Sequence, residues 1–174
     1  VIISCPFSDF GAEHPQMEEL LNICDMWKVP VLIDMAYFGM CHDIEIDLSH
    51  KCIEEVTFSL GKTFPIIGAR AGIRLQKNEV DDAVTFANQH GIVNNFGALF
   101  GLTCIESWDS DYIVRECKDI QLQVCDSLNV NPSKCIIFAT SDNEEWSELN
   151  RGNTTSRLCI SQDIEQQYDK QDNQ

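Results

Sequence analysis

The sequence predicts an α/β protein in which helices cover both faces of a mainly parallel sheet, giving three layers. Short apolar runs without alternation, such as residues 31–33, are typical of strands that are covered on both sides. Between these runs, apolar residues recur at helical spacing, as at Met17, Leu21 and Cys24. Strands and helices therefore alternate along the chain, which is the pattern of an α/β sheet.

The predicted elements follow one another in a regular order. Strands are expected at residues 1–4, 31–33, 56–60, 72–75, 134–140 and 157–161. A helix is expected to start at Pro15, because proline favours the first helical turn. Further helices are expected at residues 78–90 and about 92–128, the latter with a break near 107–110. The segment from Gln162 onward is polar and is expected to be partly disordered.

This order suggests a division of the chain. Residues 1–110 are expected to form part of a large domain, residues 111–163 a small C-terminal α/β subdomain, and residues 164–174 a polar tail. The chain opens at Val1 in an apolar run that looks like a strand already under way. We therefore expect a further N-terminal portion before it.

Charge and hydropathy exclude two classes of partner. The formal net charge is −16 and the isoelectric point is about 4.4. Such a chain is a poor ligand for nucleic acids, whose phosphates attract lysine and arginine. No apolar run reaches the ~18 residues that a membrane span needs, and no signal peptide is visible. We expect neither a nucleic-acid nor a membrane partner.

The nine cysteines show no C-x-x-C spacing. Several adjoin apolar residues, so we interpret them as small buried side chains in a reducing compartment, the cytoplasm, and not as a disulfide framework. The four histidines show no spacing typical of metal ligands, and no metal site is predicted.

Polar residues gather where three predicted strands end. They lie at residues 5–8, 34–37 and 59–62. In open α/β sheets, ligands bind at the carboxyl ends of the strands. These three segments are therefore the candidates for a functional site.

Each candidate also has a purely structural interpretation. Asp34 could cap a helix or form a turn, and Lys62 could extend along the surface to solvent. The segment around Lys62 superficially resembles the end of a phosphate-binding P-loop, but that motif requires glycine where Val56 stands. Arg70, between small residues, could grip a phosphate or pair with a surface acid.

Taken together, these residues form a more specific pattern. Asp34-x-x-Tyr37 ends one strand, Ser59-x-x-Lys62 ends a later strand, and Arg70 follows eight residues on within Gly-x-Arg-x-Gly. This pattern resembles the fold-type-I pyridoxal-phosphate enzymes, above all the class I and II aminotransferases. The opening segment, residues 5–11, looks like their Asn-Pro-x-x-x-x-Gly loop. The resemblance covers about residues 1–110, and the segment 155–161 resembles the arginine-bearing strand near their C-terminus.

The resemblance implies a role for each matching residue. Lys62 would hold pyridoxal 5'-phosphate as a Schiff base and move the proton. Asp34 would pair with the pyridine nitrogen, and Tyr37 would bind the ring oxygen. The remaining implied roles are phosphate binding by Ser59 and Arg70, and binding of the substrate carboxylate by Arg157. The family usually has asparagine at the position of Cys5, so Tyr37 would carry more of the ring-oxygen contact here, since a thiol is a weak donor.

The resemblance further implies an enzyme that transfers an amino group between an amino acid and a 2-oxo acid, working as a homodimer. Two alternatives remain open at this point. The same anchoring residues serve other pyridoxal-phosphate reactions, such as those of lyases and decarboxylases. A truncated, non-catalytic relative is the second alternative.

Overall fold

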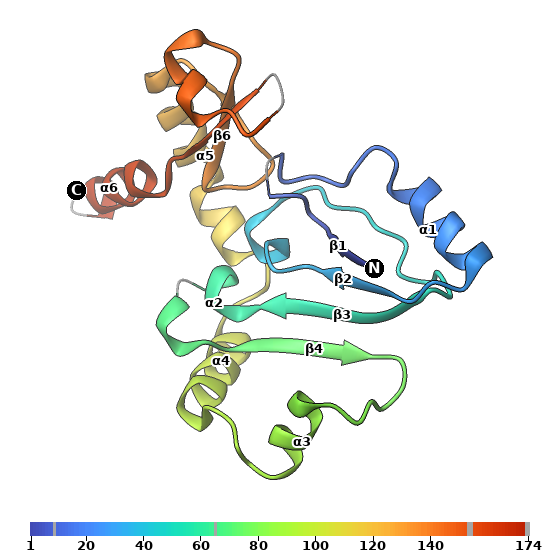
Figure 1. Cartoon of the computed structure of the whole chain (residues 1–174). Helices are drawn as coiled ribbons and strands as arrows, with labels where there is room; N and C mark the ends of the chain where they lie inside the picture. Colours follow the sequence, from blue (N-terminus) through green and yellow to red (C-terminus); the bar gives the residue numbers. More distant parts are fainter. Residues whose placement is uncertain (9, 65, 153–154, 173–174) are drawn as a thin grey trace.

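The computed structural model describes residues 1–8, 10–64, 66–152 and 155–172. Asp9, part of the predicted opening loop, and the last two residues of the predicted tail lie outside this description. The α/β class is confirmed: a four-stranded sheet, a three-stranded sheet and helices make up the molecule (Figure 1). The division of the chain at residue 110 stays a prediction.

The larger sheet contains the four strands expected in the first half of the chain. They are β1 (Ile2–Ser4), β2 (Val31–Asp34), β3 (Ile53–Ser59) and β4 (Gly72–Gln76), in the spatial order β1-β2-β3-β4. The first three run parallel, and β4 runs antiparallel to β3. The sheet is therefore mixed, and the carboxyl ends of β1, β2 and β3 lie at one edge.

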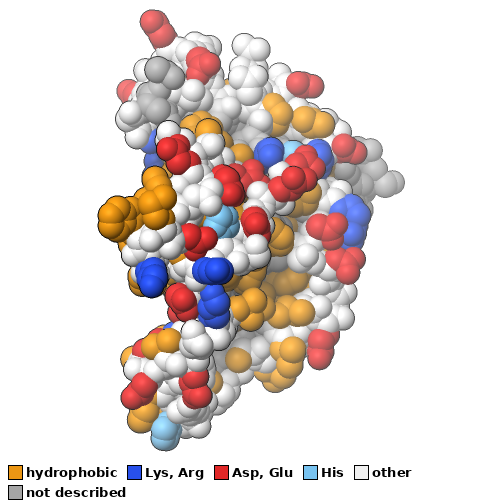
Figure 2. Space-filling view, turned by 90° about the vertical axis from the view of Figure 1, so that its right-hand side faces the viewer, with side chains coloured by type: hydrophobic (Ala, Val, Ile, Leu, Met, Phe, Trp, Pro, Cys, Tyr) orange, Lys and Arg blue, Asp and Glu red, His pale blue; other side chains and the backbone are white. Residues whose placement is uncertain are grey.

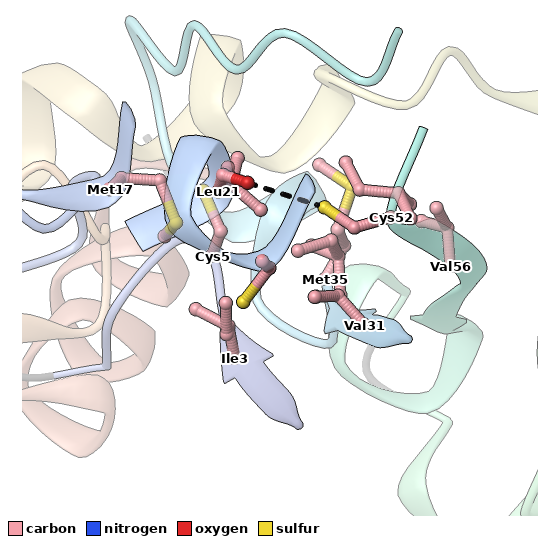
Figure 3. Packing of buried hydrophobic residues seen from close by; sticks show 11 residues of the cluster. Ile3, Cys5, Met17, Leu21, Val31, Met35, Cys52 and Val56 are labelled. Atoms are coloured by element: carbon pink, nitrogen blue, oxygen red, sulfur yellow. Dashed lines mark hydrogen bonds between the residues drawn. The ribbon is translucent and has the colours of Figure 1, made fainter. Parts of the chain in front are cut away.

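Helix α1 (Met17–Trp27) covers one face of this sheet. Its Leu21 packs with Ile3 and Ile33 in the main hydrophobic core, where each is at least nine-tenths buried. Figure 3 shows Leu21 and Ile3 among the side chains of this core. Burial of one such side chain stabilises the fold by roughly 1.5–3 kcal/mol. The apolar residues whose helical spacing predicted α1 are thus the residues that face the sheet.

The opposite face of β2 carries Asp34. Side chains alternate between the faces of a strand, so Asp34 points away from the face on which Ile33 meets α1. In register, Asp34 lies between Ser4 of β1 and Thr57 of β3. The carboxylate therefore belongs to a polar row at the strand ends.

The helices after β3 are α2 (Leu60–Thr63), α3 (Ala83–Gln89), α4 (Asn95–Ser107) and α5 (Tyr112–Leu128), with a short 3-10 turn, η2 (Ile67–Ala69). Helix α2 was not predicted, and α3 is shorter than the helix predicted at residues 78–90. The break expected near residues 107–110 is confirmed between α4 and α5. Helix α3 starts late because the Asp82 carboxylate accepts a hydrogen bond from the amide of Thr85, which caps the helix at that point.

The second sheet is antiparallel, in the order β5 (Asn131–Pro132), β6 (Phe138–Ser141), β7 (Ser156–Cys159). The strand predicted at residues 134–140 starts only at Phe138, because the chain makes a turn before it. A 3-10 helix, η3 (Glu144–Leu149), lies between β6 and β7. The segment predicted to be partly disordered contains a helix instead, α6 (Ser161–Asp172), whose Ile164 packs into the core of this sheet.

One buried amide holds the turn before β6. The side chain of Gln121, on α5, is 1% exposed. Its Nε2 lies 3.0 Å from each of three carbonyl oxygens, those of Ser133, Cys135 and Phe138. The turn is thereby tied to the helix that covers it.

A two-residue bridge joins the two sheets. The segment after η1 (Phe38–Met40) pairs with the turn before β6, with Cys41 opposite Cys135. The amide of Ile136 donates to the carbonyl of Met40 at 2.8 Å, and the amide of His42 to that of Lys134 at 3.1 Å. This bridge places the C-terminal elements at the carboxyl edge of the larger sheet (Figure 1).

The surface is strongly acidic, as the net charge of −16 requires. Figure 2 shows carboxylates spread over one face among hydrophobic and neutral side chains, with fewer lysines and arginines. In the described residues, no helix is both long and apolar enough to cross a membrane. All nine cysteines are free thiols, and only Cys159 is exposed to a large degree.

His50 joins α1 to the segment before β3. Its Nδ1 lies 2.9 Å from the Asp25 carboxylate and its Nε2 3.3 Å from that of Glu18. The imidazolium can donate to both acids, and the bond to Asp25 is the main cause that raises the pKa of His50 above its usual value. The same bond lowers the pKa of Asp25.

We predict that this contact makes the stability of the protein depend on pH. Because the pKa of His50 is raised by folding, its contribution is complete below the unfolded value of about 6.5 and is lost as pH rises through the folded value. The loss of stability caused by His50→Gln, measured by urea unfolding, should therefore be largest near pH 6 and shrink toward pH 9. His90→Gln is the control, since the Nδ1 atom of His90 faces a backbone carbonyl. An effect of His50→Gln that is constant over this range would contradict the prediction.

Candidate active site

The carboxyl edge of the larger sheet brings the predicted segments together. Strand β1 ends at Ser4, β2 at Asp34 and β3 at Ser59, and these strands run parallel. Cys5 follows β1 directly, and its amide donates to the carbonyl oxygen of Asp34 at 3.0 Å. The expected meeting of three strand ends is thus present in the structure.

Lys62 lies on the short helix α2, three residues beyond the end of β3. Its Nζ lies 4.0 Å from the centroid of the Tyr37 ring. A lysine ammonium over an aromatic face gains about 0.5–1 kcal/mol, and more where water is excluded. The side chain is half-buried. Lys62 therefore turns toward the strand-end residues instead of extending freely into solvent.

Tyr37 links Lys62 to the second sheet. Its ring also packs against Phe138, with 5.8 Å between the ring centroids. Burial raises the pKa of the Tyr37 phenol, and the positive charge of Arg157 opposes that shift. The phenol is therefore neutral at physiological pH and can donate a hydrogen bond.

Arg157, on β7, comes from the far end of the chain to the same place. Its guanidinium lies 4.4 Å from the centroid of the Phe138 ring. Its Nη1 donates toward Ser8, with the Oγ at 3.2 Å and the carbonyl oxygen at 3.4 Å. A continuous series of contacts thus runs from the loop after β1, through Arg157, Phe138 and Tyr37, to Lys62.

The Asp34 carboxylate is fixed by the backbone that follows it. Its Oδ1 accepts a hydrogen bond from the amide of Ala36 at 3.0 Å. This is the turn-forming role that an aspartate often has. The turn leads directly into Tyr37, so Asp34 also positions the tyrosine.

Cys5 is fully buried. Its side chain belongs to the core that contains Ile3, Met17 and Leu21 (Figure 3). Burial, with a smaller contribution from the charge of Glu13, raises the pKa of the Cys5 thiol to about 11. The thiol is therefore neutral and packed among apolar side chains, and its predicted contact with a ligand stays a prediction.

Ser59 and Arg70 are connected to this series less directly. The Ser59 hydroxyl makes no capping hydrogen bond to α2, and its carbonyl accepts one from the Thr63 hydroxyl at 3.1 Å. Arg70 is exposed and has a left-handed backbone with φ of 50°. It lines a hollow of about 410 Å³ together with Leu60 and residues of α4. The structure brings Lys62, Tyr37 and Arg157 together and leaves Arg70 at the surface.

A second hollow, of about 430 Å³, opens beside Lys62. Its walls are largely apolar and come from η1, α5, α6 and the turn before β6. Three carboxylates, those of Glu116, Glu165 and Asp169, also line it. A phosphate group is disfavoured next to these acids, whereas an apolar group with a positive charge suits them.

Three residues at the centre of this arrangement have no recognisable signal in the sequence. Phe138 looks like any apolar strand residue, yet it contacts both Tyr37 and Arg157. Cys41 and Cys135 show no motif spacing, yet they face each other across the bridge between the sheets. Only the fold places them beside the predicted residues. In the part of the chain that the structure describes, no group of three or more histidine, cysteine or acidic side chains is arranged to hold a metal ion.

The fold is found in solved aminotransferases. The aspartate aminotransferase of Thermotoga maritima superposes with a TM-score of 0.65 at 13% identity, covering 98% of this chain and 56% of that protein. For the aromatic aminotransferase of Pyrococcus horikoshii the TM-score is 0.63 at 16% identity, with 97% and 57% covered. For the alanine aminotransferase of Pyrococcus furiosus it is 0.57 at 19% identity, with 80% and 41% covered. The chain thus spans about half the length of these proteins.

Sequence comparison gives the same assignment. No curated protein sequence matches the chain significantly. The family model of the aminotransferases of class I and II, however, matches residues 1–113, which contain β1 to β4, Asp34, Tyr37, Ser59, Lys62 and Arg70. Because this match covers well over half of the chain, the protein belongs to the family of class I and II aminotransferases.

Proposed function

We propose that this chain contributes the cofactor-anchoring part of a pyridoxal-phosphate-dependent aminotransferase, with Lys62 as the residue that binds the cofactor covalently. The observation that carries the proposal is the contact of Lys62 with Tyr37 at the strand ends. Members of the family use pyridoxal phosphate. The order of Asp34, Tyr37, Ser59 and Lys62 along the chain supports the same use here.

The residues present fit the groups of this cofactor. Pyridoxal phosphate supplies an electron-withdrawing ring that stabilises negative charge on the substrate carbon. Asp34 offers an anion for the ring nitrogen, from a rigid turn on the face of β2 opposite α1. The neutral phenol of Tyr37 offers a hydrogen bond to the ring oxygen. Lys62, once its amine is free, would carry the proton between substrate atoms.

Phosphate binding is proposed for Ser59 and Arg70. The Ser59 hydroxyl is not engaged in capping α2, and the exposed Arg70 guanidinium can grip two phosphate oxygens at once. The hollow beside Lys62 is a poor place for the phosphate because of its three carboxylates. The available Ser59 and Arg70 side chains and the acidic hollow beside Lys62 both favour a phosphate near Ser59 and Arg70, where β3 ends and β4 begins.

Arg157 is proposed to bind the carboxylate of the amino-acid or 2-oxo-acid substrate. Its planar guanidinium matches a carboxylate, and the ring of Phe138 holds it in place. Its Nη1 also donates toward Ser8, which holds the guanidinium at the loop after β1.

A homodimer forms part of the proposal. Helix α4 exposes Phe96 at 76%, Leu99 at 65% and Leu102 at 50%. Neighbouring exposed apolar side chains on one helix are typical of a surface that a second chain covers. We propose that this surface of α4 meets a second copy of the chain.

We predict that Lys62 is the site of cofactor attachment. Borohydride reduction of the protein loaded with pyridoxal phosphate should fix the cofactor to the peptide that contains Lys62, as seen by mass spectrometry. Lys62→Ala should abolish that modification and the visible absorption band. Lys77→Ala is the matched control, because Lys77 is an exposed lysine whose Nζ donates to the carbonyl of Lys51. A colourless wild-type protein, or labelling of other lysines alone, would contradict the proposal.

Arg70 and Arg157 should differ in what they bind. We predict that Arg70→Ala weakens cofactor binding and that Arg157→Ala weakens substrate binding. Loss of a charge-assisted hydrogen bond costs about 1.5–3 kcal/mol, so each dissociation constant should rise about 10- to 100-fold. Titrations with the cofactor, and then with a 2-oxo acid, separate the two effects. The reverse pattern would exchange the roles of the two arginines.

We predict that Leu99→Asp shifts the protein from dimer to monomer, because it places a charge in the centre of an apolar contact. Light scattering coupled to size-exclusion chromatography measures the mass over a range of concentrations. Leu122→Asp is the control, since this leucine is also partly exposed, but on α5. A wild-type protein that is monomeric at all concentrations would refute the proposed interface.

A further inference from the structure

Two cysteines face each other where the two sheets are joined. Cys41 and Cys135 are partners in the isolated antiparallel bridge. The hydrogen bonds on either side come from the neighbouring residues, between Ile136 and Met40 and between His42 and Lys134. Cys41 and Cys135 are therefore a non-hydrogen-bonded pair, in which the Cα atoms lie about 4.5 Å apart and the side chains are closest. This separation lies within the range that a disulfide spans.

The two thiols already interact. Their hydrogen bond is the main cause that raises the pKa of Cys41 and lowers that of Cys135. The positive charges of Arg157 and Lys62 add to the effect on Cys135. Of the two thiols, Cys135 is thus the one that loses its proton more readily and Cys41 the one that retains it, which suits two successive substitutions at sulfur.

Access to the pair requires the contact between the two sheets to open. Cys41 retains 9% of its surface, whereas Cys135 is fully buried. The bridge has a backbone hydrogen bond on either side, and the two cysteines also pack with Met40 and Phe138 in a buried cluster. Folded proteins open locally for short periods, and such an opening exposes the sulfurs. Hydrogen peroxide, which is little larger than water, can reach the sulfurs when the bridge opens.

We propose that Cys41 and Cys135 form a reversible disulfide that joins the two sheets when the protein meets a peroxide. The Cys135 thiolate attacks one peroxide oxygen, the O–O bond breaks, and the departing hydroxide takes up a proton to leave as water. The Cys41 sulfur then attacks the resulting sulfenic acid, the S–O bond breaks, and a second water leaves with the Cys41 proton. Two thiols are oxidised by two electrons, and one peroxide is reduced to two waters.

The disulfide would act on the site through its position. Cys41 follows η1, which Tyr37 precedes, and Cys135 lies three residues before Phe138. The rings of Tyr37 and Phe138 contact each other. The Lys62 amine lies over the Tyr37 ring, and the Arg157 guanidinium lies over the Phe138 ring. A covalent bond at the bridge fixes the distance between the two aromatic residues. The modification itself does not require that the chain bind a cofactor, so it can be tested apart from the proposed function.

The test is peptide mapping of the full chain after mild peroxide treatment. Under non-reducing conditions we expect a linked peptide pair containing Cys41 and Cys135, which dithiothreitol separates. In a Cys159→Ser protein, which lacks the most exposed thiol, the count of titratable thiols after denaturation should fall from eight to six. The midpoint of thermal unfolding should rise on oxidation and return on reduction.

Two variants test the assignment. In Cys41→Ser the linked pair should be absent and the rise in the unfolding midpoint lost. Cys135→Ser should behave in the same way, and Cys41→Ser remains informative if Cys135→Ser does not fold. A linkage of Cys41 to Cys5 instead, oxidation to sulfinic acids without a linked peptide, or an unchanged thiol count would overturn the proposal.

Discussion

The geometry of the site depends on the buried side-chain amide of Gln121, whose Nε2 lies 3.0 Å from three carbonyl oxygens. These contacts hold the carbonyls of Ser133, Cys135 and Phe138 in one turn. The turn contains Cys135, which forms one side of the bridge to the larger sheet. It ends at Phe138, whose ring contacts both Tyr37 and Arg157. The carbonyls of Cys135 and Phe138 also accept hydrogen bonds from the amides of Phe138 and Ser133, so loss of the Gln121 side chain would affect the Ser133 carbonyl most. A buried carbonyl that loses its partner costs about 1–3 kcal/mol. The positions of Lys62 and Arg157 relative to each other therefore depend on a buried residue of α5.

Much of the fold could be predicted from the sequence because its signals are local. Apolar runs located β1 to β4, and helical spacing located α1. The direction of β4 was not accessible, because apolar runs do not encode strand direction. The twelve residues that connect β3 to β4 are also enough for a short parallel crossover. The start of β6 at Phe138 was missed because it depends on Gln121, which is distant in sequence. The helix α6 was missed because its polar composition outweighed the helical spacing of Ile164 and Tyr168.

The residues of the candidate site likewise fall into those with a local sequence signal and those without one. Asp34, Tyr37, Ser59 and Lys62 could be found from the sequence because each lies at or just after a strand end, and strand ends are local features. Phe138 and the pair of Cys41 and Cys135 could not be found, because their role arises only when the second sheet meets the first. For Arg70 the local pattern was clear, but the structure leaves its side chain at the surface, beside α4. Sequence signals thus indicated the residues that we propose to anchor the cofactor, and the structure shows the tertiary contacts that connect Tyr37, Lys62 and Arg157.

The contact between Arg157 and Ser8 joins residues that are 149 positions apart. On a ribosome the N-terminal segments emerge first, and the larger sheet can begin to pack while the rest of the chain is still being made. Arg157 becomes available only after all four strands of the larger sheet have been made. The ends of β1, β2 and β3 must therefore remain folded for some time before Arg157 has been synthesised. Interruption of synthesis shortly before β7 would therefore give a protein that contains the larger sheet but lacks the guanidinium beside Ser8 and Phe138.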